Sequence, residues 1–411
     1  MTDRFTLAVT GQSLIKYDTR NIDIPAFKAI QTLLRNADMS FTNFEGTIIG
    51  SHGGWPLKGS FFGCSEPFVL DALRDTGFGA LSLSNNHAFD LGPSGVLSTI
   101  EEVEKRGFLH AGLGRDDCEA SQASRGIFKQ KRLALVAMDG GPGPDFMYAA
   151  DAHEHRPARP GVNRLKLSQV IKVDQSAFEA LRSIRDRVGY TSIDLTNDSQ
   201  PDDPRLVDAY DELAIGRAIF KKSESFGRNV TVDGNDIEKN LRAIAAASHD
   251  GCLVVAYLHH HHWASDWYEV PDWVGAVARQ CIDAGAAMFV SHGAPVLQPV
   301  EIYRRRPIFY SLGNFIFHVR SEKSTWHARE VWESVVGICT YGSDNNLTDI
   351  KFYPVLIGGE DALKEKSLES RLVPHLVTGE SAQKILIRFK AQSARLGAEI
   401  ELVDGVGLLR V

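Results

Sequence analysis

The chain is poor in cysteine, and no two of its cysteines have the spacing of a thiolate metal site. Its five cysteines are odd in number and far apart, at Cys64, Cys118, Cys252, Cys281 and Cys339. Neither a disulfide framework nor a Cys-x-x-Cys zinc site is expected from this pattern. The natural expectation is a protein of a reducing compartment, the cytoplasm.

Long apolar runs and an excess of positive charge are also missing. The first ten residues lead directly into a strand-like segment, without the apolar stretch that a secretory signal needs, and no later run is long enough to predict a membrane span. The 45 basic and 52 acidic residues give a net charge of -7, which does not suit phosphate-backbone binding. We therefore expect neither a membrane nor a nucleic-acid partner, and the sequence gives no prediction of the oligomeric state.

What remains is the composition of an ordinary globular protein, 43% hydrophobic and 24% charged over 411 residues. The organisation of the chain predicts a single domain over residues 1–411 that carries an insertion at about 140–235. In this insertion the composition shifts to His, Pro, Arg and Asp, with helical segments near 174–187 and 205–222. We expect the insertion to cover the active site and to select the substrate.

Outside the insertion, strand-like runs alternate with runs of helical spacing, which predicts an α/β fold. The expected strands are 5–10, 39–45, 80–84, 133–138, 252–258, 287–290, 308–317, 335–341 and 350–355. The expected helices are 25–36, a run around 68–73, 95–106, 237–247, 273–284 and 380–396.

Polar residues recur just past the apolar strands. In chain order they are Gln12, Glu45, Asn86 with His87, His259 to His262, and Ser291 with His292. Each of these residues taken alone is more often a turn former, a solvated strand end or a core histidine than a ligand. Their repeated placement is the stronger signal, because ligands bind beyond the carboxyl ends of parallel strands. Carboxylate, amide oxygen and imidazole together suit a divalent metal ion.

Four consecutive histidines follow the strand at 252–258. On an extended segment the side chains alternate, so His259 and His261 point one way while His260 and His262 point the other. We expect His259 to be the first ligand because it ends the strand directly. We expect His261 to be a second ligand or a proton carrier, and Trp263 to help exclude water.

These motifs resemble the CapA-like (poly-γ-glutamate capsule synthesis) branch of the calcineurin-like metallophosphoesterase fold, over roughly residues 5 to 320. The resemblance rests on Thr42-Asn43-Phe44-Glu45, Ser84 to Gly92 with Asn86 and His87, Arg159 to Asn163, the His259 region, Ser291-His292, Pro295 to Glu301, and Tyr310 to Phe315.

The resemblance implies a four-layer α/β/β/α sandwich with an inserted cap region. It also implies that Glu45, Asn86, His259 and His292 bind metal and that His87 is a general acid or base. We further expect Gln12 to be a metal ligand, His261 and Asp90 to take part in catalysis, and the substrate to contact Arg159, Asn163, Trp263 and Asn314.

Two positions depart from the family pattern. The family usually has Gly-Asp where this chain has Gly11-Gln12, and a second histidine where this chain has Pro295. Both departures remove a strong ligand, so a second cation would be held more weakly. The expected cofactor is one or two divalent ions, with Mn, Zn, Mg, Fe and Ca all compatible with these ligands.

The fold's usual chemistry predicts a metal-dependent hydrolase acting on a phosphoester or a peptide or amide bond, with a small-molecule or peptide substrate. One alternative is a metal-dependent peptide epimerase that exchanges a Cα proton, because the resembling family includes epimerases of lasso-peptide pathways. Another is a non-catalytic binding module for an anionic polymer.

Overall fold

The computed structural model describes residues 4–190, 194, 210–216, 218–319, 326, 328–365 and 367–411. Contacts between residues divide the chain into two compact units. The first unit comprises Met1–Leu165 and Gly234–Val411, and the second comprises Lys166–Asp233. The sequence prediction placed an insertion at 140–235, and its position over the active site stays a prediction.

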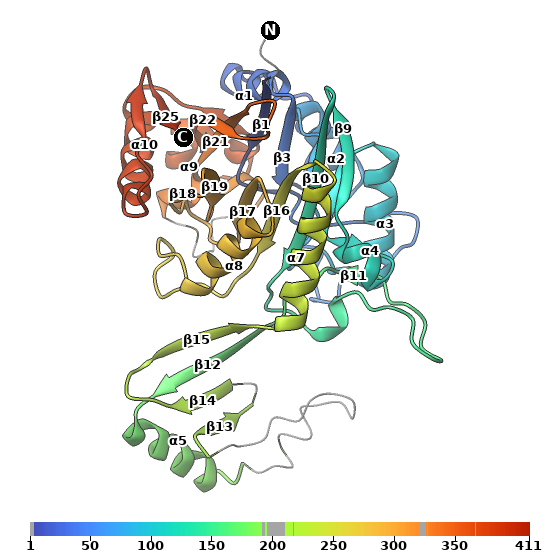
Figure 1. Cartoon of the computed structure of the whole chain (residues 1–411), viewed down its shortest axis with the longest axis vertical. Helices are drawn as coiled ribbons and strands as arrows, with labels where there is room; N and C mark the ends of the chain where they lie inside the picture. The colour runs from blue at the N-terminus through green and yellow to red at the C-terminus, as the bar shows by residue number, and fades with distance from the viewer. Residues whose placement is uncertain are drawn as a thin grey trace. The chain divides into compact units, whose positions relative to one another are not determined.

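The first sheet of the large unit has nine strands (Figure 1). Its order is β24 (Glu401–Val403), β25 (Val406–Arg410), β22 (Leu347–Ile357), β21 (Glu333–Tyr341), β1 (Phe5–Val9), β3 (Met39–Asn43), β6 (Ala80–Ser82) and β7 (Leu109–Ala111), with β23 (Pro374–Leu376) paired to β22. The strands from β1 to β7 are parallel. The carboxyl ends of β3 and β6 therefore lie at one edge, which brings the segments that follow them together.

The second sheet has six strands, four of them parallel. Its order is β18 (Val300–Tyr303), β19 (Arg306–Phe309), β17 (Met288–His292), β16 (Leu253–His259), β10 (Lys131–Asp139) and β9 (Ser124–Phe128). Only the edge strands β9 and β18 pair antiparallel. The central strands are almost entirely apolar and buried on both faces, as parallel strands between two layers must be.

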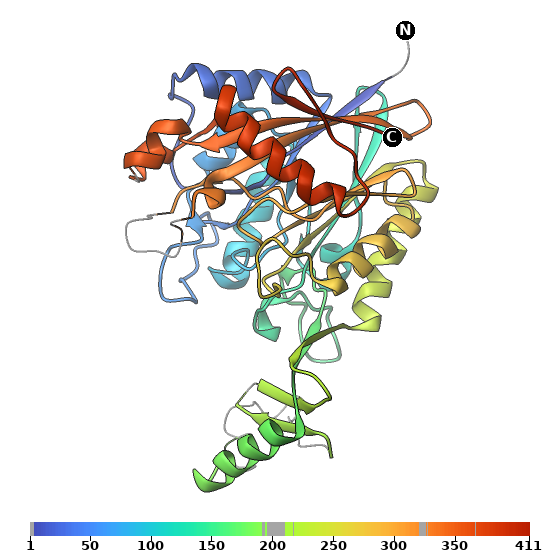
Figure 2. The ribbon, with the colours of Figure 1, turned by 90° about the vertical axis from the view of Figure 1, so that its left-hand side faces the viewer.

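Helices cover the outer face of each sheet, and the two sheets pack against each other. On the outer face of the first sheet lie α1 (Pro25–Asn36), α2 (Phe68–Thr76) and α3 (Gly92–Lys105). In contrast, α10 (Gly379–Ala394) packs on the opposite face of the antiparallel part, where it also contacts β18 of the second sheet (Figure 2). On the second lie α7 (Gly234–His249) and α8 (Asp272–Asp283). Between the sheets, Phe41 packs edge-on against Tyr257 with ring centroids 5.6 Å apart. The predicted four-layer α/β/β/α sandwich is confirmed.

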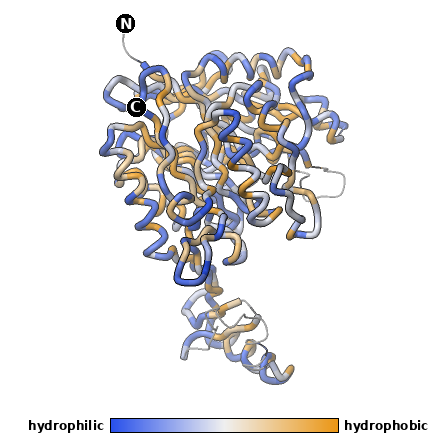
Figure 3. Tube along the Cα trace, turned by 90° about the vertical axis from the view of Figure 1, so that its right-hand side faces the viewer, coloured by the Kyte–Doolittle hydropathy of each residue, from blue (hydrophilic) through white to orange (hydrophobic). Residues whose placement is uncertain are grey.

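Short elements complete the large unit. They are β2 (Gln12–Leu14) paired with β20 (Asn314–Phe317), β4 (Thr47–Ile48) with β5 (Cys64–Ser65), β8 (Leu113–Gly114) with β11 (Gly161–Val162), and the helices α4 (Asp117–Ser121) and α9 (Gly359–Glu365). Apolar stretches run through the interior and polar stretches over the outer helices (Figure 3). Among all helices of the described ranges, none has both the length and the apolar character to cross a bilayer.

The small unit is a four-stranded sheet with one long helix. The strand order is β13 (Glu212–Ile215), β14 (Ala218–Lys222), β12 (Leu167–Val173) and β15 (Gly227–Val232), and α5 (Gln175–Arg187) packs on it through Phe178. The helix expected near 174–187 is present. The helix expected near 205–222 is wrong for 212–215 and 218–222, which form a hairpin, and 205–209 and 217 lie outside the described residues. Gly216, with a φ of 56°, supplies the tight turn that ends helical spacing here.

Candidate metal centre

Five polar residues come together where the parallel strands of both sheets end. Asp139, His259 and His292 are the last residues of β10, β16 and β17, and the three are register neighbours. Glu45 and Asn86 follow β3 and β6 in the other sheet. Each residue sits there because an apolar strand ends just before it, so the strand pattern of the sequence also positions the site.

Donor atoms at or after the ends of three different strands lie close together. Nε2 of His259 lies 3.0 Å from Oδ1 of Asn86 and 4.0 Å from Oε1 of Glu45. The donor atoms of Glu45, His259 and His261 all lie within 4.8 Å of one another. Metal–ligand bonds of about 2.1 Å join donor atoms up to about 4.2 Å apart. His259 therefore lies at a distance from both Asn86 and Glu45 that one divalent ion could bridge, and a small movement would bring the donor atom of His261 within the same reach.

The protonation of these residues also fits a cation. Burial holds the pKa of His259 well below its ordinary value, and burial followed by the charges of His87 and Lys58 lowers the pKa of His261 to about 4. Both imidazoles are therefore neutral near pH 7, which is the form that binds metal. Burial also raises the pKa of Glu45, because a carboxylate out of contact with water is less stable in its charged form, and His87 and Lys58 offset this only in part. A divalent cation would supply further positive charge.

The histidine run is held by main-chain hydrogen bonds to both neighbouring segments. The His259 carbonyl accepts from the Gly140 amide (2.7 Å), the His260 amide donates to the His292 carbonyl (3.1 Å), and the His261 amide donates to the Gly141 carbonyl (2.7 Å). The rings of His259 and His261 lie 5.0 Å apart, whereas His260 packs on Trp273. The alternation expected from an extended segment is thus present.

His292 lies beside His259 but outside the group whose donor atoms are within 4.8 Å. Its Nδ1 is 3.3 Å from the Tyr257 hydroxyl, and its buried Nε2 has no hydrogen-bond partner in the part of the chain that the structure describes. Burial lowers the pKa of His292 to about 3. A neutral imidazole whose Nδ1–H donates to Tyr257 keeps Nε2 free as a donor for an ion.

Gln12 faces Asn314 across the β2–β20 pair. Its Nε2 donates to Oδ1 of Asn314 over 3.1 Å, while its buried Oε1 has no partner among the residues described. The Asn314 amide in turn donates to the carbonyls of Pro295 and Val331. Gln12 therefore keeps one oxygen available to a ligand, whereas the amide group of Asn314 is used inside the protein.

His87 and Asp90 form a hydrogen-bonded pair directly after the predicted ligand Asn86. Nδ1 of His87 lies 2.7 Å from Oδ2 of Asp90, and the Lys58 ammonium lies 2.9 Å from Oδ1 of the same carboxylate. Lys58 also donates to the Asn86 carbonyl over 2.5 Å. The second nitrogen of His87 is left for a substrate, which is the arrangement of a histidine acid or base oriented by a carboxylate.

The residues predicted to contact substrate lie in different surroundings. The Trp263 ring is 4.9 Å from that of His261. Arg159 donates to the carbonyls of Tyr148 (3.0 Å) and Asp145 (3.2 Å). Asn163 is fully buried and donates to the Ala137 carbonyl and to Oδ1 of Asn240. The structure thus brings Trp263 to the centre, and the substrate contacts of all four residues, Asn314 included, stay predictions.

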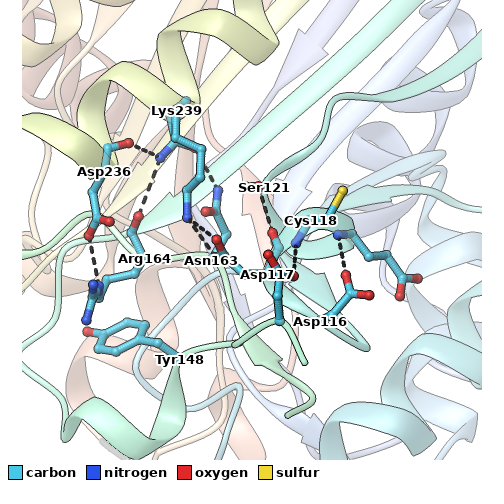
Figure 4. Close-up of polar contacts among 12 residues, drawn as sticks. Asp116, Asp117, Cys118, Ser121, Tyr148, Asn163, Arg164, Asp236 and Lys239 are labelled. Carbon is cyan, nitrogen blue, oxygen red and sulfur yellow. Dashed lines mark hydrogen bonds and ion pairs between the residues drawn. The ribbon is translucent and has the colours of Figure 1, made fainter. Parts of the chain in front are cut away.

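Asp139 was not among the predicted site residues, although it ends a strand in the same way as Glu45. Its Oδ2 accepts from the Gly141 amide and the Tyr148 hydroxyl, each at 3.2 Å, and its Oδ1 has no partner within the described ranges. Burial raises its pKa to about 7. Tyr148 lies under the guanidinium of Arg164, which pairs with Asp236 over 2.8 Å (Figure 4). The signal that could have found Asp139 is the carboxylate at the end of an apolar strand.

The chain is similar to several known proteins. Residues 6–319 match the family described as Bacterial capsule synthesis protein PGA_cap. The uncharacterized protein y4sH of Sinorhizobium fredii is 30% identical over 453 residues, covering 100% of this chain and 94% of y4sH. The PGA biosynthesis protein CapA of Bacillus subtilis is 23% identical over 292 residues, covering 71% of this chain and 56% of CapA.

Solved structures with a related arrangement include two nucleotidases. A 5'-nucleotidase precursor from Thermus thermophilus aligns with a TM-score of 0.37 at 11% identity, over 94% of this chain and 58% of that chain. The NAD nucleotidase of Haemophilus influenzae aligns with a TM-score of 0.34 at 11% identity, over 97% and 61%. The chain thus spans about three fifths of each nucleotidase. The family match and the order of the motifs agree, and the chain belongs to the PGA_cap family of bacterial capsule synthesis proteins, as its resemblance to CapA-like proteins predicted.

Proposed function

We propose that this protein is a divalent-metal-dependent hydrolase that cleaves a phosphoester or an amide bond. One observation carries the proposal. Donor atoms of Glu45, Asn86 and His259, at or after the ends of three strands, lie together beside the His87–Asp90 pair. A site that only binds a ligand needs no oriented acid or base. A metal-dependent hydrolase needs a metal site and an oriented acid or base beside it.

Glu45, Asn86 and His259 would hold a divalent ion, and His261 and His292 offer further neutral nitrogens beside it. When bound there, the ion would supply Lewis-acid chemistry, which would polarise the phosphoryl or carbonyl oxygen of the substrate and make water a better nucleophile. Trp263 packs on His261 and limits the access of bulk water to that side.

His87 moves the proton. Its Nδ1–H donates to Asp90, so Nε2 faces away from the carboxylate and is free to take a proton from water or to give one to the leaving group. Asp90 is itself fixed on its other oxygen by Lys58. The pair therefore holds the imidazole in one tautomer and one orientation, which is how a buried carboxylate supports a histidine acid or base.

The test is metal loading coupled to turnover. The full chain is stripped with chelator, reloaded separately with Mn, Zn, Mg, Fe or Ca, and measured by elemental analysis and with nitrophenyl phosphates and peptide anilides. We expect near-stoichiometric metal and turnover only in loaded protein, and loss of both in Glu45→Gln. The control is Glu101→Gln, which changes a surface carboxylate that pairs with His52. Failure to bind any of the metals would refute the proposal and favour a binding module.

One observation favours an epimerase as the second candidate. The ring of His261 lies 5.0 Å from that of His259, and His87 directly follows Asn86, whose Oδ1 is 3.0 Å from His259, so two further imidazoles flank the same centre. Exchange of a Cα proton needs such a pair. The assay is repeated with the peptides in heavy water: deuterium at Cα without bond cleavage would select the epimerase, and cleavage without deuterium at Cα selects the hydrolase.

A further inference from the structure

The segment between β4 and β5 exposes a group of large apolar side chains. Trp55 is 76% exposed, Phe61 47% and Phe62 40%, and Leu57 lies among them in the chain. Trp55 and Phe61 pack edge-on with their ring centroids 6.1 Å apart. We call these four residues the aromatic rim. Neighbouring exposed aromatic residues on a protein surface mark a site of interaction rather than a random feature.

The aromatic rim contacts His87 and Asp90, the two residues that we call the proton-transfer pair. The Leu57 amide donates to the Asp90 carbonyl over 2.8 Å. The Phe62 ring lies 5.3 Å from the imidazole of His87. Gly63 lies so close that a Cβ atom there would overlap both Oδ2 of Asp90 and Nδ1 of His87. A group held by the rim is therefore next to the reacting centre.

Lys16 gives this surface an uncompensated positive charge. Its ammonium donates to the Phe61 carbonyl over 2.6 Å and lies 5.9 Å from the centre of the Phe62 ring. Among the residues that the structure describes, no carboxylate pairs with it, in contrast to Lys58, which pairs with Asp90. Burial of the side chain lowers the pKa of Lys16, because partial removal from water disfavours the charged form. An anion beside it would restore the balance.

We propose that the aromatic rim and Lys16 form the substrate-recognition subsite of the proposed hydrolase, and that its ligand is an anion, carboxylate or phosphate, joined to a bulky apolar group. This inference rests on the proposed function, because it names the substrate class of that same site. Trp55 and Phe61 offer ring faces and edges to the apolar group. Lys16 offers a point charge to the anion, which suits carboxylate and phosphate alike.

The test measures binding instead of turnover. Isothermal titration of the full chain uses 1-naphthyl phosphate and 1-naphthylacetate as the two anions, 1-naphthalenemethanol as the neutral analogue and inorganic phosphate without the ring. We expect at least one naphthyl anion to bind about tenfold more tightly than both the neutral analogue and inorganic phosphate, a difference of about 1.4 kcal/mol. The tighter of the two anions identifies the source of the charge.

Two variants separate the parts of the subsite. Trp55→Ala should weaken every naphthyl compound about tenfold, and Lys16→Met should remove only the preference for the anions. The matched control is Ile127→Ala, which removes a 73% exposed apolar side chain from β9. Equal binding of neutral and anionic probes, or binding that Trp55→Ala leaves unchanged, would overturn the inference. Binding of the expected kind without any metal-dependent turnover would instead remove only the proposed hydrolase.

Discussion

The imidazole of His87 and the carboxylate of Asp90, three residues apart in the chain, lie 2.7 Å from each other through Nδ1 and Oδ2. Asp90 is almost completely buried and its other oxygen is held by Lys58. The carboxylate is thus fixed before any substrate arrives, and it fixes the ring in turn. His87 is the best-oriented proton carrier next to the candidate metal centre.

Asp90→Asn tests this orientation. The amide can present its NH₂ group to Nδ1 of His87, which favours the wrong tautomer, so we expect kcat to fall by about 10²- to 10⁴-fold while the bound metal stays constant. Metal content and kcat are measured on the same preparation. Asp18→Asn, which alters a surface pair with Arg20, is the control. A parallel loss of metal and turnover would make Asp90 part of the metal site instead.

His292→Ala tests the free nitrogen beside His259. We expect the variant to lose metal, because it removes a buried neutral donor. Tyr257→Phe, which removes only the hydroxyl 3.3 Å from Nδ1, should weaken metal binding about 10- to 100-fold. Titration with a metal indicator measures both, and His249→Ala at the exposed end of α7 serves as the control. Bound metal unchanged in His292→Ala would exclude His292 from the ligands.

Gly63→Ala tests the contact between the aromatic rim and the proton-transfer pair. The added methyl group would overlap Asp90 and His87, so we expect lower turnover with little change in bound metal. Gly234→Ala is the matched control, since a Cβ atom there meets no atom within 4 Å. Thermal unfolding of both variants shows whether the fold persists. Turnover equal to that of the control would mean that the segment around Gly63 moves to accept the methyl group and does not fix His87 and Asp90.

The buried side chain of His318 should make the unfolding free energy of the protein depend on pH. Its Nδ1 accepts from the amides of Lys16 (2.9 Å) and Tyr17 (3.2 Å), and its Nε2 donates to the Leu372 carbonyl (2.8 Å). Burial lowers its pKa from 6.5 to about 4. The unfolded chain therefore binds a proton below pH 6.5 that the folded chain takes up only near pH 4. Stability should fall across this window by about 3 kcal/mol from His318 alone.

Urea unfolding between pH 7 and pH 4 measures this dependence. In His318→Asn the unfolding free energy should be lower at pH 7 but should fall less steeply as the pH drops. His249→Asn, at the exposed end of α7, should keep the slope of the unchanged protein. Identical slopes in both variants and the unchanged protein would assign the acid sensitivity to other buried groups.

Much of the large unit could be predicted from periodicity. The helices expected at 25–36, 273–284 and 380–396 are α1, α8 and α10 with small shifts at their ends, because one apolar face each is buried on a sheet. The grouping of Glu45, Asn86 and His259 followed from the same pattern, since each directly follows an apolar strand. This part of the site could therefore be predicted from the position of each residue relative to the end of a strand.

The features that the sequence analysis missed depend on tertiary contacts, which the hydrophobic periodicity of the sequence does not reveal. Lys58 and the aromatic rim belong to an irregular segment, and only its hydrogen bonds to Asn86 and Asp90 bring it to the centre. Tyr257 looked like one more core residue of an apolar strand, and its hydroxyl meets His292 only because two strands are in register. The helix expected near 205–222 was wrong for 212–215 and 218–222, because Gly216 turns the chain back into a hairpin there.

The main-chain bonds around the histidine run have a consequence for the energetics of metal binding. The amides and carbonyls of the segment from His259 to His261 are hydrogen-bonded to Gly140, Gly141 and His292. The entropic cost of ordering the segment that carries the imidazoles is therefore part of folding and not of metal binding. Little ordering is left for the ion to impose, unlike in a zinc finger, where binding and folding are one event. The metal-free chain should therefore fold with its donor atoms already in place. Removal of the ion should abolish the chemistry of the site without unfolding the protein.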